Sequence, residues 1–468
     1  MSRTTLRGMT TALRVGLLGC GNVGGALAHL LVDDAERIAA RTGIELQLAA
    51  VAVRSLSRER DAPIPPGVLT TDAGAVVSDP DVDVVVEVIG GIEPARTLIL
   101  TALKGGKPVV TANKELLANC GSELFEAAST AGVDLLFEAA VAGAIPLIRP
   151  LRESLAGERI QRVMGIVNGT TNFILTRMSE AGASYHDALA EAQSLGYAER
   201  DPTADVEGFD AAAKAAILAN VAFGARVVAG DVYREGISAI TPQDIAVAHK
   251  LGYTVKLLAV VEHSDETADA AEAVAVRVHP AMVPSTHPLA SVRDSFNAVF
   301  VEGDAVGQLM FLGRGAGGMP TASAVLGDLL DAAHDLTTGG LGRTVTLRRT
   351  TIRPIDDLRS AYYLTLEVAD RPGVLHAVSG VLGKHQVSIQ LMEQEGLSAV
   401  YAHGYSSGGP SPGSGAGSGE GIGGGESGAR LVFVTHPAYE RDVQACLGEL
   451  RHLDVVHQIG GLLRVIGP

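Results

Sequence analysis

A glycine-rich turn between a strand and a helix constrains the fold of this chain more than any other feature. Leu13–Leu18 predicts a fully buried strand, and Val23–Val32 predicts the helix that follows it. Between them, Gly19, Gly21 and Gly24 form the pattern GxGxxG. The first glycine permits a tight turn, the second lets the backbone approach a pyrophosphate, and the third lets the helix pack closely on the sheet. With the positive end of the helix, the turn predicts a dinucleotide-binding site, although a glycine turn without a ligand is the alternative.

The residues of this turn and the end of the next strand predict how the cofactor is held. The expected contacts within the turn are Gly19, Gly21, Asn22, Val23 and Gly24. The next strand, predicted at Glu45–Val53, lacks the acid that usually holds the ribose 2′-hydroxyl of NAD. Arg54 stands there instead and suits a 2′-phosphate, so the sequence favours NADP(H) over NAD(H). A solvated surface arginine is the other interpretation.

Strands and helices alternate along the first part of the chain. Further strands are predicted at Val82–Ile89 and Lys107–Thr111, with a helix at Glu93–Lys104 between them. This alternation predicts an α/β fold with a Rossmann-type, doubly wound parallel sheet over residues 1–142.

Two further domains are predicted after the parallel sheet. Residues 143–314 mix apolar helices with strand-like runs and predict a second, α+β domain. Residues 359–468 follow an order close to βαββαβ, which is a ferredoxin-like arrangement, with a short strand expected at Ser398–Tyr401. Residues 406–428 offer almost no apolar side chains to bury, so we expect a flexible Gly/Ser-rich surface insertion.

Composition narrows the functional class. A chain of 468 residues predicts about three domains, and 37 basic against 53 acidic residues leave a net charge of −16. That charge disfavours a nucleic-acid partner. We find no signal peptide and no apolar run long enough to span a membrane. Cys20, Cys120 and Cys446 are too few and too scattered for a disulfide framework or a CxxC site, so we expect a cytoplasmic enzyme or metabolite-binding protein.

Two strand ends in the first domain carry chemistry-bearing residues. Ligands of doubly wound sheets bind at the carboxyl ends of the strands. The segment VVVEVIGG ends in Gly90 and Gly91, which permit close approach of a cofactor. The segment PVVTANKELL places Thr111, Asn113 and Lys114 just past a strand. Lys114 is positioned to touch the cofactor or the reacting oxygen, or else it merely begins a helix.

The segment GYAERDPTADVEGFDAAAK is the third motif. Its charged residues are Glu199, Asp201, Asp205, Glu207, Asp210 and Lys214. Asp210 and Lys214 are four residues apart at the start of a helix, so they lie on one face. A lysine beside carboxylates in a cleft can exchange a proton with a substrate hydroxyl, and the carboxylates can receive an ammonium group. An ordinary surface salt bridge is the alternative that spacing leaves open.

Together these motifs resemble the homoserine dehydrogenase family over essentially the full chain. The family signature AxxxGxxxxDPxxDxxGxDxxxK is present from Ala192 to Lys214, and GCGNVG, VIGG, TANK, EAAVAGAIP and NGTTNFIL occur in the family's order. The resemblance implies NAD(P)-dependent interconversion of L-homoserine and L-aspartate 4-semialdehyde, in threonine, methionine and isoleucine biosynthesis. It implies that residues 143–314 form the catalytic, substrate and dimerisation domain. It also implies that Lys214 is the catalytic acid/base and that Lys114 lies near both cofactor and substrate. The implied homoserine site contains Glu199, Asp205, Asp210 and Thr170, with Glu199 as the best candidate to bind the substrate ammonium.

The resemblance also implies a structural monovalent cation, usually sodium. Its implied ligands are Glu138 and the backbone carbonyls of Val141, Gly143 and Ile145. A later glycine loop, which begins at Gly315, is implied to close over the cofactor and to lead into a helix, at about residues 315–345, that returns to the first domain. A turn that only joins two domains is the simpler interpretation of the segment with the cation ligands.

The C-terminal unit resembles an ACT domain through DRPGVLHAVSGVLGKHQVSI. The implied effector is L-threonine, and a structural dimerisation module is the alternative. The family suggests a homodimer or homotetramer. Two rival functions remain. A semialdehyde dehydrogenase needs an activated cysteine nucleophile, which the motifs do not provide. A non-catalytic sensor of NADP and threonine would not need Lys214 and its acidic neighbours, and these residues are intact.

Overall fold

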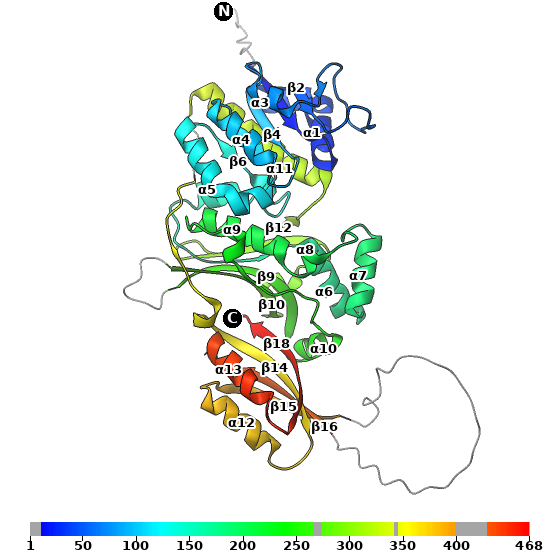
Figure 1. Cartoon of the computed structure of the whole chain (residues 1–468), viewed down its shortest axis with the longest axis vertical. Coiled ribbons are helices and arrows are strands. Elements are labelled where there is room, and N and C mark those ends of the chain that lie inside the picture. The colour runs from blue at the N-terminus through cyan, green and yellow to red at the C-terminus, as the bar shows by residue number, and fades with distance from the viewer. Residues whose placement is uncertain (1–10, 265–272, 341–344, 398–427, 468) are drawn as a thin grey trace, which may run out of the picture. The chain divides into compact units, whose positions relative to one another are not determined.

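The computed structural model describes residues 11–264, 273–340, 345–397 and 428–467 (Figure 1). The chain divides into two compact units, which are described separately. Unit 1 consists of residues 1–238, 255–280 and 285–353, and unit 2 consists of residues 239–254, 281–284 and 354–468. Three predicted features lie outside the described residues: most of the polar N-terminal segment, the strand at 398–401, and the insertion at 406–428 apart from Gly428.

Unit 1 contains the predicted doubly wound sheet, with all its strands parallel and in the order β3-β2-β1-β4-β5-β6. Its strands are β1 (Thr11–Leu18), β2 (Ile44–Ala52), β3 (Leu69–Thr70), β4 (Val84–Glu87), β5 (Val109–Thr111) and β6 (Leu135–Leu136). Its helices are α1 (Asn22–Asp33), α2 (Ala35–Thr42), α3 (Ala73–Ser78), α4 (Ala95–Lys104) and α5 (Lys114–Ala131). This strand order places a ligand crevice beside β1, where the direction of winding reverses.

A helix from much later in the chain completes the core of this sheet. Helix α11 (Gly318–Thr338) packs Val325, Leu329 and Ala332 among the buried residues of β1, β2 and α1. Figure 1 shows this yellow-green helix beside the blue and cyan elements. It provides the apolar cover that a parallel sheet needs on its faces.

The rest of unit 1 is built on a mixed sheet. Strand β11 lies antiparallel between β12 and β7, and β7 pairs antiparallel with β9, whereas β8 and β13 pair in parallel with β10. Its strands are β7 (Ile160–Ile166), β8 (Tyr233–Arg234), β9 (Tyr253–Ser264), β10 (Ala273–Pro284), β11 (Phe296–Gly303), β12 (Gly307–Arg314) and β13 (Thr351–Ile352). Its helices are α6 (Gly169–Ala181), α7 (Tyr185–Ser194), α8 (Thr203–Val206) and α9 (Phe209–Ala222). Short turns of helix are η1 (Glu138–Ala140), the π-helical η2 (Pro150–Ser154), η3 (Ala229–Asp231) and η4 (Pro288–Ser291).

Unit 2 has the predicted βαββαβ order. Its elements are α10 (Pro242–Lys250), η5 (Ile355–Asp357), β14 (Arg359–Ala369), α12 (Val374–Lys384), β15 (Ile389–Leu397), β16 (Gly428–Thr435), β17 (Ala438–Tyr439), α13 (Glu440–Leu450) and β18 (Val456–Val465). The sheet runs β18-β14-β16-β15, and the last residues of β10 pair with β18. Alternate residues of β14, such as Leu364 and Leu366, face the core under α12 and α13. The ferredoxin-like prediction is confirmed.

Among the residues that the structure describes, no helix combines the length and the apolar character that crossing a bilayer requires.

Candidate active site

The glycine turn follows β1 as predicted, and its three glycines differ in their surroundings. Gly19 has a φ of +97°, and a Cβ there would lie 2.8 Å from the carbonyl oxygen of Val88. A Cβ at Gly24 would lie 2.2 Å from the carbonyl oxygen of Gly19, so only glycine lets α1 pack so closely. A Cβ at Gly21 would meet no atom within 4 Å. The turn therefore leaves Gly21 and the first residues of α1, Asn22 and Val23, open to a ligand.

Arg54 lies at the same edge of the sheet as the glycine turn. It comes two residues after β2, which pairs with β1, and its side chain is exposed. The backbone N–H of Gly19 donates to the carbonyl of Ala52 at 2.9 Å and ties the turn to the end of β2. The residues on either side of Arg54 are Val53 and Ser55, so neither neighbour at this strand end is acidic.

A buried carboxylate that no sequence motif indicates joins the two other predicted strand ends. Glu87, at the end of β4, is fully buried, and its carboxylate accepts the backbone N–H of Gly90 at 3.1 Å and the hydroxyl of Thr111 at 2.6 Å. Asn113 then donates to the carbonyl of Gly91 at 2.7 Å. These bonds fix the glycine pair against the start of α5, which is where Lys114 begins its helix. A charged residue at the end of an otherwise apolar strand was the signal available.

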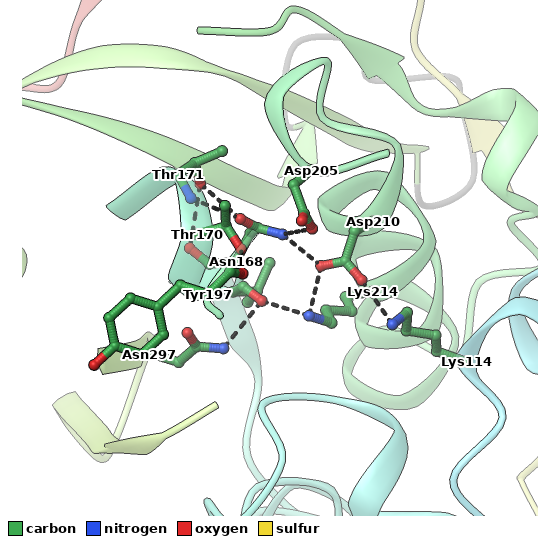
Figure 2. A network of polar contacts seen from close by, with 10 residues as sticks. Lys114, Asn168, Thr170, Thr171, Tyr197, Asp205, Asp210, Lys214 and Asn297 are labelled. Atoms are coloured by element: carbon green, nitrogen blue, oxygen red, sulfur yellow. Dashed lines mark hydrogen bonds and ion pairs between the residues drawn. The ribbon is translucent and has the colours of Figure 1, made fainter. Parts of the chain in front are cut away.

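The carboxylate–lysine motif forms a compact ionic cluster, shown in Figure 2. Lys214, on α9, donates to Asp210 at 2.6 Å and to the backbone carbonyl of Val167 at 2.7 Å. Lys114, on α5, lies 2.9 Å from the other oxygen of Asp210. The side chain of Lys214 is only 10% exposed, so the ordinary surface salt bridge is the wrong interpretation of this motif.

Asparagine and threonine side chains from the NGTTN segment organise this cluster. Asn168 accepts the backbone N–H of Thr171 at 2.8 Å and so caps α6. Its amide donates to Asp205 at 2.6 Å and to Asp210 at 2.9 Å (Figure 2). Thr170 donates to the backbone carbonyl of Tyr197 at 2.7 Å, which ties the start of α6 to the loop before α8.

Burial and the neighbouring charges set the protonation of the cluster. Burial lowers the pKa of Lys214 below its ordinary value, although the Asp210 carboxylate opposes this. Burial alone would raise the pKa of Asp210, but the ammonium groups of Lys214 and Lys114 hold it far below its ordinary range. Burial raises the pKa of Asp205. The pKa of Lys114 is raised because the attraction of Asp210 outweighs the effect of burial.

Glu199 is the one predicted substrate residue that stands apart. Its side chain is exposed on the loop between α7 and α8, and its backbone carbonyl accepts a bond from Gln193 at 3.0 Å. Among the described residues, no hydrogen bond or ion pair joins the Glu199 carboxylate to Asp205, Asp210 or Lys214. The predicted set is therefore brought together only in part.

The segment predicted to hold a cation forms a tight buried turn. Ala142 and Gly143 have φ values of 58° and 56°. The Glu138 carboxylate accepts three consecutive backbone N–H groups, those of residues 147–149, at 2.5 to 2.9 Å. Within the described residues, no backbone hydrogen bond reaches the buried carbonyl oxygens of Val141, Gly143 or Ile145. These oxygens are free to accept a ligand, whereas the carboxylate is already engaged.

The later glycine loop lies against both the turn and the cluster. A Cβ at Gly318 would lie 2.8 Å from the carbonyl oxygen of Asn22, so the start of α11 meets the start of α1. A Cβ at Gly315 would lie 2.1 Å from the side-chain amide of Asn297. The loop thus runs from Asn297, on β11, to the glycine turn.

Comparisons with known proteins agree with this arrangement. Family models match at residues 19–138 (homoserine dehydrogenase, NAD binding domain), at 146–330 (homoserine dehydrogenase) and at 362–398 (ACT domain). A homoserine dehydrogenase from Mycobacterium tuberculosis is 49% identical over 454 residues, which cover 97% of each chain.

Two solved structures place the likeness in three dimensions. A homoserine dehydrogenase from Thiobacillus denitrificans has a TM-score of 0.85 and 40% identity, over 97% of this chain and 98% of the other. A hyperthermophilic archaeal homoserine dehydrogenase in complex with NADPH has a TM-score of 0.58 and 30% identity, over 69% of this chain and 98% of the other. The sequence, the nucleotide-binding sheet and the buried ionic cluster lead to one conclusion: this chain belongs to the homoserine dehydrogenase family, whose members are oxidoreductases acting on a CH–OH group.

Proposed function

We propose that the chain interconverts L-homoserine and L-aspartate 4-semialdehyde with Lys214 as the general acid and base. The observation that carries this proposal is the buried Lys214 ammonium, in which two of the three N–H groups are engaged by described residues, namely Asp210 and Val167. When bound, the nicotinamide cofactor accepts or supplies the hydride. In oxidation the neutral amine of Lys214 takes the proton of the homoserine hydroxyl. In reduction its ammonium returns a proton to the oxygen as negative charge develops there.

The test is the appearance of reduced nicotinamide when homoserine and NADP⁺ are added to the protein. Lys214→Ala should abolish turnover and leave cofactor binding measurable by fluorescence titration. A non-catalytic sensor of the cofactor would show binding in both proteins and turnover in neither. A rate for the variant close to that of the wild type would remove Lys214 from the chemistry.

The acidic side chains around Lys214 are proposed to bind the substrate amino group. Asp205 is half-buried, and its carboxylate, which accepts from Asn168 at 2.6 Å, lies in the same cluster as Lys214. Glu199 is proposed as the ammonium contact of the bound substrate, and its exposed position on the α7–α8 loop is compatible with this role. We expect Glu199→Gln to raise the KM for homoserine with little change in kcat. An unchanged KM would exclude that contact.

We propose that NADP(H) is the preferred cofactor. The exposed Arg54 beside the glycine turn supports this, and so does the absence of an acid at the same strand end. The related archaeal enzyme with bound NADPH adds support by analogy. Arg54→Ala should weaken the binding of NADP⁺ more than that of NAD⁺. An equal loss for both cofactors would exclude a contact with the 2′-phosphate.

We propose that the turn at residues 138–145 binds a monovalent cation, probed as Na⁺. The buried carbonyl oxygens of Val141, Gly143 and Ile145 fit a hard cation, and Glu138 supports the turn through its bonds to the following backbone. Thermal unfolding in NaCl should occur at a higher temperature than in tetramethylammonium chloride of equal ionic strength. Equal unfolding temperatures in the two salts would reject the site.

We propose L-threonine as a feedback effector that binds unit 2, in keeping with a place in threonine, methionine and isoleucine biosynthesis. A cavity of about 220 Å³ lies beside the loop Asp370–Gly373 and is lined in part by Gln394 and Leu431. Added L-threonine should lower the homoserine-dependent rate. Unchanged rates would exclude threonine as an effector and favour the structural dimerisation module. Size-exclusion chromatography would then test whether the protein is the expected homodimer or homotetramer.

A further inference from the structure

The backbone carbonyl of Val167 accepts hydrogen bonds from two side chains, and only one of them belongs to the lysine motif. Lys214 donates to it at 2.7 Å, and the amide of Asn297 donates to it at 3.0 Å (Figure 2). Asn297 lies on β11, opposite Gly313 of β12, and is 1% exposed. It stands 83 residues after Lys214 in the chain, and no motif singles it out.

The donor count of Lys214 gives this bond its significance. An ammonium group has three N–H donors. Asp210 and the Val167 carbonyl take two of them, so one remains for a substrate oxygen. In the neutral amine the same two acceptors hold the two N–H groups, and the lone pair then occupies the third direction. The two acceptors thus decide where the exchanging proton lies.

Each of these two acceptors is itself held by an asparagine. Asn168 donates to Asp210 at 2.9 Å, and Asn297 donates to Val167. A Cβ at Gly315 would lie 2.1 Å from both Cγ and Nδ2 of Asn297, so this amide packs directly against the backbone of Gly315. Within the described residues the Oδ1 of Asn297 is buried and accepts no hydrogen bond, so the bond that Nδ2 donates to the Val167 carbonyl is the one hydrogen bond of this side chain.

We propose that Asn297 is a positioning residue for Lys214. It holds the Val167 carbonyl in place, and through that carbonyl it directs the free N–H or lone pair of Lys214 toward the substrate oxygen. This inference rests on the proposed acid–base role of Lys214. Because hydride transfer needs donor and acceptor carbons aligned while the proton moves, a small displacement of Lys214 lowers kcat more than it alters substrate binding.

The principal test is Asn297→Asp, which keeps the size of the side chain and replaces the donor with an oxygen. The new carboxylate repels the Val167 carbonyl and lies within about 6 Å of the Lys214 nitrogen, which raises the pKa of that lysine. We expect kcat for homoserine oxidation to fall by about 10- to 100-fold, with the KM for homoserine and the Kd for NADP⁺ changed by no more than about twofold. The rising limb of the pH–rate profile should move to higher pH by about one unit.

The matched control is Asn220→Asp, the same substitution at another buried asparagine. Asn220 lies on α9 like Lys214, is 3% exposed, and uses its Oδ1 to accept the N–H of Val227 at 2.9 Å, a bond that aspartate keeps. This variant should lose thermal stability without moving the pH profile. If Asn297→Asp does not fold, Asn297→Ala provides the test, with the same expected loss of kcat at nearly constant KM.

The outcomes separate this inference from the proposed function. If Lys214→Ala abolishes turnover but both Asn297 variants behave like Asn220→Asp, the positioning role is overturned and the acid–base role stands. If Lys214→Ala remains active, both fail, because there is then no proton exchange at residue 214 to position. A fall in kcat found only for the Asn297 variants, with a displaced pH limb in Asn297→Asp, supports the inference.

Discussion

Replacing Asp210 by asparagine should disturb the ionic cluster more than any other isosteric change. One oxygen of Asp210 accepts from Lys214 at 2.6 Å and from Asn168 at 2.9 Å, and the other lies 2.9 Å from Lys114. An asparagine has one oxygen and one NH₂ group. Whichever way it turns, the NH₂ group faces at least one ammonium. The substitution therefore removes a buried charge and also sets donor against donor.

The cost follows from the burial of Lys214. Removing one partner of a buried ion pair costs about 3–5 kcal/mol, because the remaining charge is left uncompensated. The protein can reduce this cost by releasing the proton of Lys214. Burial already lowers the pKa of Lys214, and the Asp210 carboxylate is the main group that raises it. Because the folded-state pKa of Lys214 falls further below the unfolded value, the unfolded state of the variant binds more protons. The loss of stability should therefore be largest near pH 7 and should shrink as the pH rises toward 10.

Two assays measure these effects. Urea unfolding at pH 7 and pH 9.5 gives the difference in unfolding free energy between wild type and Asp210→Asn at each pH. The pH dependence of kcat/KM for homoserine oxidation reports the lysine, and its rising limb should move to lower pH while the maximal rate falls by about 10²-fold. The control is Asp187→Asn, at an exposed aspartate in the first turn of α7 that accepts the hydroxyl of Ser184. It should leave the pH profile unchanged and alter the unfolding free energy by less than about 1 kcal/mol at both pH values. Wild-type stability at pH 7 together with an unmoved limb in Asp210→Asn would refute the reasoning.

Other residues provide independent predictions. Gly21→Ala should leave the unfolding temperature of the cofactor-free protein unchanged but weaken NADP⁺ binding at least 10-fold, because its Cβ meets only open space where the cofactor is expected. Gly24→Ala should lower the unfolding temperature, because its Cβ would lie 2.2 Å from the backbone of Gly19. Calorimetry and cofactor titration would contradict these two predictions if Gly21→Ala lowered the unfolding temperature and Gly24→Ala affected only NADP⁺ binding. Burial lowers the pKa of Lys256 to about 8, against 10.5 ordinarily, so between these pH values the unfolded state holds more protons. The stability of wild type relative to Lys256→Met should rise across that window by about 3 kcal/mol in urea unfolding, and a flat difference would show that Lys256 titrates normally.

Local patterns along the chain predict the doubly wound sheet well. The strands predicted at Leu13–Leu18 and Glu45–Val53 correspond to β1 and β2 within two residues. Near-continuous apolar runs are typical of the strands of a parallel sheet that is covered on both faces. The strand predicted at Val82–Ile89 is shorter in the structure and ends at Glu87, because the Glu87 carboxylate binds the backbone of the following turn. The short elements β3 and β6 have too few residues to show any period.

Local sequence patterns do not reveal contacts between segments that are distant in the chain. Asp210 and Lys214 share a helix face, so their pairing follows from spacing, but Lys114 and Asn168 reach Asp210 only through the tertiary fold. No periodic pattern marks Asn297, because a single polar residue in a strand can equally well lie at the surface or in the interior.

The two compact units are not continuous segments of the chain, whereas the sequence patterns predict domains that follow one another along it. Residues 239–254, which include α10, belong to unit 2 together with residues 354–468, although they lie inside the segment predicted as the catalytic domain. Helix α11, by contrast, joins the core of the first sheet from far along the chain, as the family resemblance implies. Short-range patterns locate elements, but the assignment of an element to a compact unit depends on the partner that covers its apolar face.

The central claim is that the amine at residue 214 exchanges the proton of the reacting oxygen. The most direct measurement is the single-turnover rate of NADPH oxidation by aspartate semialdehyde in Lys214→Ala, with and without added methylamine. We expect the rate to fall at least about 10²-fold and to recover partly as methylamine enters the space that the side chain vacates. A single-turnover rate within twofold of wild type, unaffected by the amine, would contradict the account.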